Sequence, residues 1–229
     1  MRYAVPLLLV AMLLGARSAA LAAENATAPD AEAKPAAGTQ VTSKRVLTPA
    51  EKAEKEARKA CKIEICDILA TKEPQGPDVA CDILKTWRDD DIVKMLGGRI
   101  NWPWGKAVCQ SKLRLKRAPL ANAMSAPRAR VELESQTVRC SLHQKGGKPY
   151  VVEVELAPEV TFKDGKATGA TINWGDVSAP MLIYPLLYAG TSLDNSANVL
   201  GPEVARLVND FMGKGCAEVK DALPGRRAN

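Results

Sequence analysis

A helix is the first element that the pattern of apolar and polar positions predicts, over residues 48–71. Thr48 and Glu51 have the spacing of a capping box, and Pro49 occupies the first helical position between them. The first half of this segment is mostly charged residues and alanine, so the second half is expected to be the buried part. Its apolar positions are Cys61, Ile63, Ile65, Ile68 and Leu69.

Residues 78–97 are predicted as a second helix, because their apolar residues recur at roughly helical spacing. Gly97 and Gly98 would end it, and the short connection through Pro74 and Gly76 predicts that the two helices pack as an antiparallel hairpin. The apolar positions that support the second helix are Val79, Ile83, Leu84, Trp87, Val93 and Leu96.

From residue 107 the apolar period changes to two, which indicates strands with one buried face. Four strands are predicted, at residues 108–117, 130–142, 150–162 and about 170–174. The second needs a bulge near residues 135–137, where the parity of its apolar residues switches. Pro158 places the third at an edge or a bend, and Asp164-Gly165 reads as a hairpin turn. These strands predict a four-stranded antiparallel meander packed on helices.

The C-terminal part is predicted to be helical again. Residues 180–189 are apolar and interrupted by Pro185, so we expect a short or kinked helix packed in the interior. A second helix is predicted from Pro202, with apolar residues at helical spacing until Gly213. The whole pattern predicts an α+β fold, similar in architecture alone to cystatin-like or nuclear-transport-factor-like domains, with no shared motif.

The N-terminus carries an export signal. Residues 1–22 have a basic start, an apolar stretch too short to span a bilayer, and small residues that favour cleavage after Ala22. Residues 23–47 lack an apolar period and are predicted to be a disordered tether. We therefore expect a domain over residues 48–217, a flexible polar tail over 218–229, and a location in the bacterial periplasm or outside the cell.

Charge and composition exclude several functions. The full chain has a net charge of +6, and removal of Arg2 and Arg17 with the signal leaves 30 basic against 26 acidic residues, or +4. This weak field on an exported chain argues against nucleic-acid binding. His143 is the only histidine, which excludes zinc sites built on histidine pairs. No motif identifies a catalytic residue, a metal site or a cofactor.

All six cysteines follow the signal, and an even number in an oxidising compartment predicts three disulfides. Residues 66 and 81 are nearly level in the predicted helical hairpin, which favours a Cys66–Cys81 bond. Cys61 faces another way and would pair with Cys109. The bond that remains would then join Cys140 to Cys216.

Trp102 and Trp104 are the candidate ligand-binding residues, because they flank Pro103 in a chain that is only 4% aromatic. Proline favours an extended Trp102, so the two indoles are expected to point to different sides. One would cap the core, while the other could bind an envelope glycan or peptide at a cleft rim.

The first function hypothesis is therefore a non-enzymatic, exported binding or interaction protein, whose ligand would be a glycan, a peptide or another periplasmic protein. The alternatives are a hydrolase-type enzyme that uses dispersed carboxylates and a purely structural envelope protein. Carboxyl groups with strongly shifted pKa values in one cleft would favour the enzyme. A cleft lined only by apolar and aromatic groups would favour binding.

Overall fold

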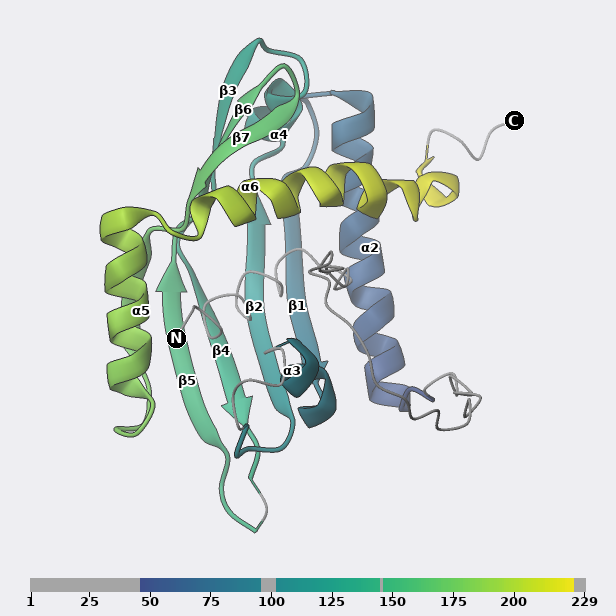
Figure 1. Cartoon of the computed structure of the whole chain (residues 1–229). Helices are drawn as coiled ribbons and strands as arrows, with labels where there is room; N and C mark the ends of the chain where they lie inside the picture. The colour runs from purple at the N-terminus through teal and green to yellow at the C-terminus, as the bar shows by residue number, and fades with distance from the viewer. Residues whose placement is uncertain (1–45, 96–101, 145, 225–229) are drawn as a thin grey trace, which may run out of the picture.

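The computed structural model describes residues 46–95, 102–144 and 146–224, and shows an α+β fold built on two antiparallel sheets (Figure 1). The predicted signal, all but the last two residues of the predicted tether, and Gly97-Gly98 lie outside these residues. The larger sheet has the order β1 (Val79–Trp87), β2 (Ala107–Leu115), β4 (Gln136–Leu142), β5 (Tyr150–Leu156) and β8 (Trp174–Ser178). The smaller sheet joins β3 (Arg128–Glu132), β6 (Glu159–Lys163) and β7 (Lys166–Thr171).

Helices lie along both margins of the larger sheet and across it (Figure 1). The predicted first helix is confirmed as α2 (Pro49–Thr71), with Thr48 and Glu51 forming the capping box. It packs beside β1, whereas α5 (Tyr184–Ala197) follows the opposite margin and α6 (Gly201–Asp210) crosses between them. Two short helices complete the set, α3 (Asp89–Met95) and α4 (Arg117–Ala123).

The predicted second helix is wrong, because residues 79–87 form strand β1, the edge of the larger sheet, so there is no helical hairpin. Val79, Cys81 and Ile83 are buried in alternation, while Leu84 is exposed, which is the period of a strand. A short apolar run can fit either the helical or the strand period. Here residues 79–87 pair with β2 along their whole length, which makes them a strand. In the described part of this segment, residues 78–95, only α3 is helical, and it begins at Asp89.

The expected four-stranded meander is also wrong, since its long strands divide between the two sheets. The switch of parity near residues 135–137 is real, but its cause is the passage from β3 in the small sheet to β4 in the large one. At Pro158 the chain passes from β5 in the large sheet to β6 in the small one. The Asp164-Gly165 turn between β6 and β7 is confirmed, and both residues have positive φ, of 51° and 74°.

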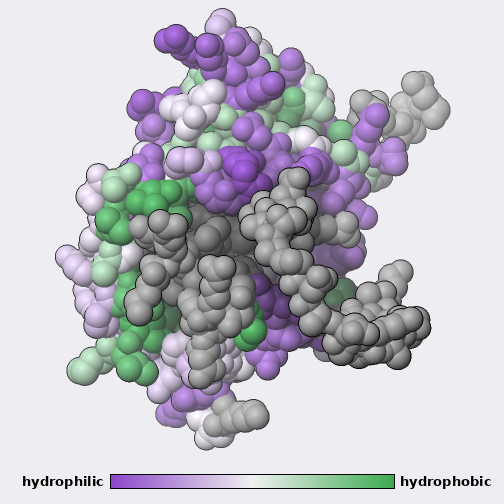
Figure 2. Space-filling view, viewed as in Figure 1, coloured by the Kyte–Doolittle hydropathy of each residue, from purple (hydrophilic) through white to green (hydrophobic). Residues whose placement is uncertain are grey.

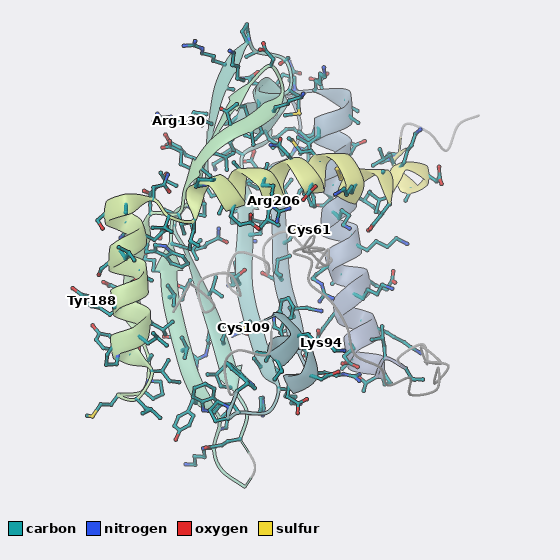
Figure 3. The ribbon with its side chains drawn as sticks, viewed as in Figure 1. Cys61, Lys94, Cys109, Arg130, Tyr188 and Arg206 are labelled. Carbon is teal, nitrogen blue, oxygen red and sulfur yellow. A yellow bond between two sulfur atoms is a disulfide. The ribbon has the colours of Figure 1, made fainter. Side chains whose placement is uncertain are left out.

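All six cysteines are paired, but in none of the three expected pairs. The bonds are Cys61–Cys81, Cys66–Cys216 and Cys109–Cys140; Figure 3 labels Cys61 on α2 and Cys109 on β2. The Cys66–Cys81 prediction assumed two helices. A strand advances about 3.3 Å per residue against 1.5 Å in a helix, so residues equally distant from the turn are not level. Cys109 and Cys140 are directly opposite each other in the β2–β4 ladder.

The C-terminal segment is more ordered than its composition suggested. The helix expected from Pro202 is confirmed as α6, but the chain does not stop turning at Gly213 and continues in a π-helical turn, Phe211–Gly215. The described part of the predicted tail is not free, because Val219 and Leu223 are buried against Cys66. The Cys66–Cys216 bond holds this segment to α2.

Candidate functional site

The helix α5 is fixed to the core by one of its faces. Ile183 and, within α5, Leu187, Thr191 and Asp194 are buried, at spacings of four, four and three residues. Ile183 and Leu187 pack into the main hydrophobic core together with residues of β5 and β8. Asn198, in a left-handed conformation, caps the C-terminal end of the helix, and its side chain donates to the carbonyl of Ala170 at 2.9 Å. These contacts determine which face of α5 remains outside.

Trp174, the first residue of β8, sets the rotation of α5. Its indole Nε1 donates to Asp194 Oδ2 at 2.8 Å, and its backbone N–H donates to Asn195 Oδ1 at 2.9 Å. Asn195 Nδ2 donates to the Trp174 carbonyl at 2.8 Å. The Asn195 side chain thus satisfies both backbone groups of Trp174, as a neighbouring strand would. Asp194 Oδ1 also accepts from Leu200 N, which ties the start of α6 to the same carboxylate.

The outer side of α5 and the residues just before it are apolar and exposed. We call this the α5 surface. Met181 is 91% exposed, Leu182 81%, Leu186 63% and Tyr188 56%. Figure 2 shows hydrophobic side chains gathered over α5, and Figure 3 labels Tyr188 on this helix. The α5 surface consists of Met181, Leu182, Tyr184, Leu186, Tyr188 and Leu193.

The expectation that residues 180–189 pack in the interior is therefore wrong. One face of the helix is buried as expected, but Leu186 projects about 90° away from that face and is 63% exposed. Together the six residues of the α5 surface expose on the order of 700 Å², at roughly 150–250 Å² for a fully exposed large side chain. This area covers both flanks of α5, because Leu186 and Tyr188 project about 160° apart on a helix. Monomeric soluble proteins rarely exceed about 300–600 Å² in one such patch.

A groove of about 620 Å³ separates α5 from the outward face of the sheet. Tyr184 and Tyr188 stack with ring centroids 5.8 Å apart and form part of its helical wall. The strand side is acidic and carries Glu153, Glu155 and Asp176. The apolar α5 surface thus borders a groove of different chemistry.

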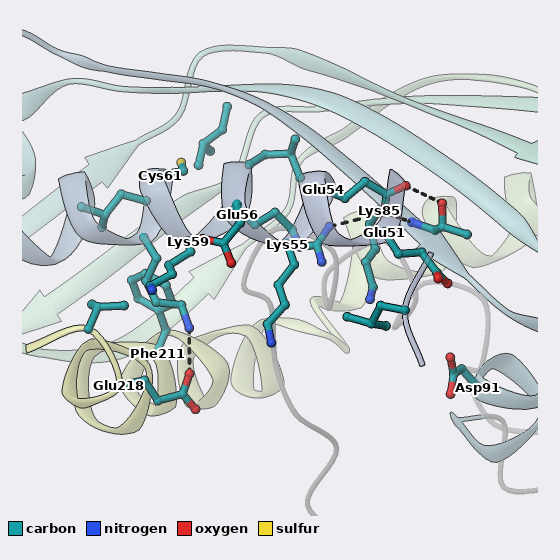
Figure 4. A pocket seen from close by; sticks show the side chains of 18 of the residues that line it. Glu51, Glu54, Lys55, Glu56, Lys59, Cys61, Lys85, Asp91, Phe211 and Glu218 are labelled. Atoms are coloured by element: carbon teal, nitrogen blue, oxygen red, sulfur yellow. Dashed lines mark hydrogen bonds and ion pairs between the residues drawn. The ribbon is translucent and has the colours of Figure 1, made fainter. Parts of the chain in front are cut away.

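A second cavity, of about 590 Å³, lies between α2, β1 and the C-terminal segment (Figure 4). Three of its carboxylates, those of Glu51, Glu54 and Glu218, form hydrogen bonds or ion pairs within the protein. Glu54 is buried and accepts from Thr86 N at 2.8 Å and from Thr86 Oγ1 at 2.6 Å, while Glu218 accepts from Lys62. Arg58 donates to Leu84 O on the open edge of β1. This network fastens α2 to the sheet edge.

The shifted carboxyl group of this cavity has a structural cause. Hydrogen bonds from the Arg88 guanidinium, and then from the Thr48 N–H, lower the pKa of Glu51 to about 2. A lowered pKa keeps the group ionised, whereas a general acid at neutral pH needs a raised one. Burial, followed by the charge of Arg58, lowers the pKa of Lys85. The cavity is not purely apolar, and its one carboxyl group with a strongly shifted pKa, Glu51, has that pKa lowered by structural hydrogen bonds, so the cavity does not favour either the binding or the enzyme hypothesis.

The Glu51–Arg88 pair predicts a pH dependence of stability. Because the folded-state pKa of Glu51 lies below its unfolded value, this pair stabilises the fold above about pH 5 and its contribution is lost as pH falls toward 2. The Glu51→Gln variant should therefore lose less stability than the wild type over that interval. Urea unfolding midpoints from pH 6 to pH 2 test this. Glu56→Gln changes an exposed carboxylate on the same helix; it is the control and should follow the wild type.

Trp102 and Trp104 do not point to different sides. Their rings meet edge to face, with centroids 4.8 Å apart, and both are half-buried against the main core. Trp102 Nε1 donates to the carbonyl of Gly105 at 2.8 Å. Neither residue lines the groove or the α2 cavity. Ligand binding by this pair stays a prediction, and the α5 surface is the feature that sequence reasoning missed.

Comparisons with known families, with characterised proteins and with solved structures find no significant match. Within residues 46–95, 102–144 and 146–224, no group of three or more potential metal ligands occurs. None of the helices in this part of the chain is long and apolar enough to cross a membrane. The three disulfides are consistent with an oxidising compartment outside the cytoplasm.

Proposed function

We propose that this chain is exported to the periplasm, with its leader cleaved after Ala22, and acts there as a non-enzymatic interaction protein. Its α5 surface docks another protein. The observation that carries this proposal is the exposure of Met181 and Leu182, just before α5, and of Leu186 on that helix, another face of which is fixed to the core. Exposed apolar area on the order of 700 Å² is close to the roughly 800 Å² that each partner buries in a standard interface.

A protein partner fits this surface better than a membrane or a glycan. Membrane-surface helices combine an apolar face with lysine and arginine that attract anionic lipid, but residues 167–205 contain neither. Aliphatic side chains such as Leu186 offer no hydrogen bonds to sugar hydroxyls. Tyr184 and Tyr188 supply the large aromatic area that is enriched at protein interfaces.

The Leu186→Asp variant tests the proposal. It places a charge at the centre of the α5 surface, so binding of a short leucine- and glutamine-containing peptide should weaken at least about tenfold. Its free energy of unfolding should change little, because this side chain contacts mainly solvent. Fluorescence anisotropy measures the first quantity and urea unfolding the second.

Val46→Asp is the matched control, since Val46 is also exposed and apolar but lies outside the α5 surface. It should bind the peptide like the wild type. Equal binding by Leu186→Asp and the wild type would contradict docking at α5. Sedimentation adds a second readout, because a dimer that Leu186→Asp dissociates would assign the surface to a second copy of this chain and overturn the proposal of a different partner.

A further inference from the structure

The groove beside α5 has one wall of stacked tyrosines and one of strand residues. Tyr184 and Tyr188 are 40% and 56% exposed, and their rings lie 17° from parallel. Leu186 projects from the other flank of α5, so a partner that contacts both Leu186 and the tyrosines crosses the outer face of the helix to reach the groove. The strand wall comes from the outward-facing residues of β4, β5 and β8.

Two carboxylates of the strand wall have no cationic partner among the described residues. Glu153 forms an ion pair with Arg139, which lies opposite it in the β4–β5 ladder. Glu155 instead accepts from the hydroxyl of Ser135, and Asp176 is exposed. The groove therefore keeps a negative charge that no cation of the described residues neutralises.

Gly175 leaves room for the Glu155 side chain. A Cβ at residue 175 would lie 3.2 Å from Glu155 Cβ and 3.3 Å from Glu155 Oε2, closer than side chains usually pack. The pairing of β5 with β8 shifts register between Val154 and Leu156, so Glu155 sits at an irregularity in this edge. Glycine at 175 thus allows the carboxylate to lie across β8 within the groove.

The charge of the surrounding chain has one sign. From residue 167 to residue 205 there is no lysine or arginine, whereas Asp176, Asp194 and Glu203 are acidic. Aromatic ring faces attract ammonium and guanidinium groups, and the stacked tyrosines border these carboxylates. An apolar partner with a negative charge would be repelled here.

We propose that the docking partner is a polypeptide segment that combines apolar side chains with a lysine or arginine. The apolar side chains lie on Leu182 and Leu186, and the cationic side chain enters the groove between the tyrosines and the Glu155 and Asp176 carboxylates. This inference rests on the proposed function, and it adds the charge of the partner to it.

Three peptides that differ at one position test it. Each has the same leucine-containing sequence, with lysine, glutamine or glutamate at the variable position. The wild type should bind the lysine peptide about tenfold more tightly than the glutamine peptide, and the glutamate peptide most weakly. The preference should fall as salt concentration rises.

Variants then locate the preference. Asp176→Asn combined with Glu155→Gln should lose most of the preference for the lysine peptide, with the affinity for the glutamine peptide unchanged; the tyrosine ring faces retain only a small remainder of the preference. Tyr188→Leu keeps an apolar side chain but removes a ring face, so it should weaken binding of the lysine peptide more than binding of the glutamine peptide. Glu132→Gln, an exposed carboxylate of β3 outside the groove, is the control and should keep the wild-type preference.

The outcomes separate the two proposals. If the wild type binds all three peptides equally, and Leu186→Asp binds none, the cationic partner is refuted while docking at α5 stands. If the wild type binds none of them, the proposed function itself fails. A lysine preference that is undiminished in the double variant would place the cation outside the groove and overturn the inference.

Discussion

Replacing Cys66 and Cys216 together by alanine will lower the free energy of unfolding by about 5 kcal/mol, the largest loss we expect from any of the three disulfides. This bond spans 150 residues, and in the chain-entropy argument a cross-link restricts the unfolded chain more as its loop grows. The bond also holds the C-terminal segment, because Cys216 precedes the buried Val219 and Leu223.

The other two disulfides supply the comparison. Cys61–Cys81 spans 20 residues and Cys109–Cys140 spans 31, so their removal should lower the free energy of unfolding by about 3 and 4 kcal/mol. Urea unfolding of the three double-alanine variants measures the order. A smaller loss for the 66/216 pair than for the 61/81 pair would show that strain in the folded state outweighs loop length. Non-reducing peptide mapping of the wild type checks the pairing itself.

Asp194→Ala is expected to lower the free energy of unfolding by about 3–4 kcal/mol. The substitution removes the acceptor of two hydrogen bonds, from Trp174 Nε1 and from Leu200 N, and leaves both donors buried without a partner. Because the same carboxylate joins β8, α5 and the start of α6, this variant should also weaken binding at the α5 surface.

Conservative variants make the Asp194 result specific. Asp194→Asn keeps one acceptor oxygen but turns an amide N–H toward the other donor, so an intermediate loss of about 2 kcal/mol is expected. Asp176→Asn changes an exposed carboxylate on the same strand as Trp174 and should change stability by less than about 0.5 kcal/mol. Urea unfolding tests both, and an unaltered Asp194→Ala protein would contradict the role assigned to the carboxylate.

Local signals in the sequence predicted the elements that depend on neighbouring residues. The capping box at Thr48 begins α2, Asp164-Gly165 turns the β6–β7 hairpin, and the spacing of apolar residues marks α6. Each depends on contacts within a few residues, which the sequence displays directly. The partition of the strands between two sheets could not be predicted in this way, because it depends on pairing between strands that are far apart in the sequence.

The disulfides show how one wrong element affects what is inferred from it. Residues 79–87 contain Val79, Ile83 and Trp87, which suit a helix by spacing and a strand by residue type. The choice of a helix led directly to the Cys66–Cys81 pairing. The even number of cysteines predicted that all six would be bonded, but connectivity depends on the three-dimensional arrangement.

The α5 surface and the groove beside it could not be predicted from the sequence, for a different reason. The apolar run before residue 190 was visible, but composition does not distinguish a helix buried on all sides from one exposed on its outer face. In α5 the polar residues Thr191 and Asp194 are buried, while the apolar Leu186 is exposed. This is the reverse of the usual amphipathic pattern, in which apolar residues are buried and polar ones are exposed. Glu155 and Asp176 meet Tyr188 only through the packing of α5 beside β5 and β8.

The Cys66–Cys216 bond also imposes an order on maturation. If the leader directs the chain across a membrane with its N-terminus first, Cys61 and Cys81 can join early, and Cys109 and Cys140 soon after. Cys66 then carries the one unpaired thiol of the emerging chain until Cys216, near the C-terminus, arrives. A chain cut short before residue 216 would keep that thiol, which distinguishes an incomplete molecule from a finished one by its reactivity alone.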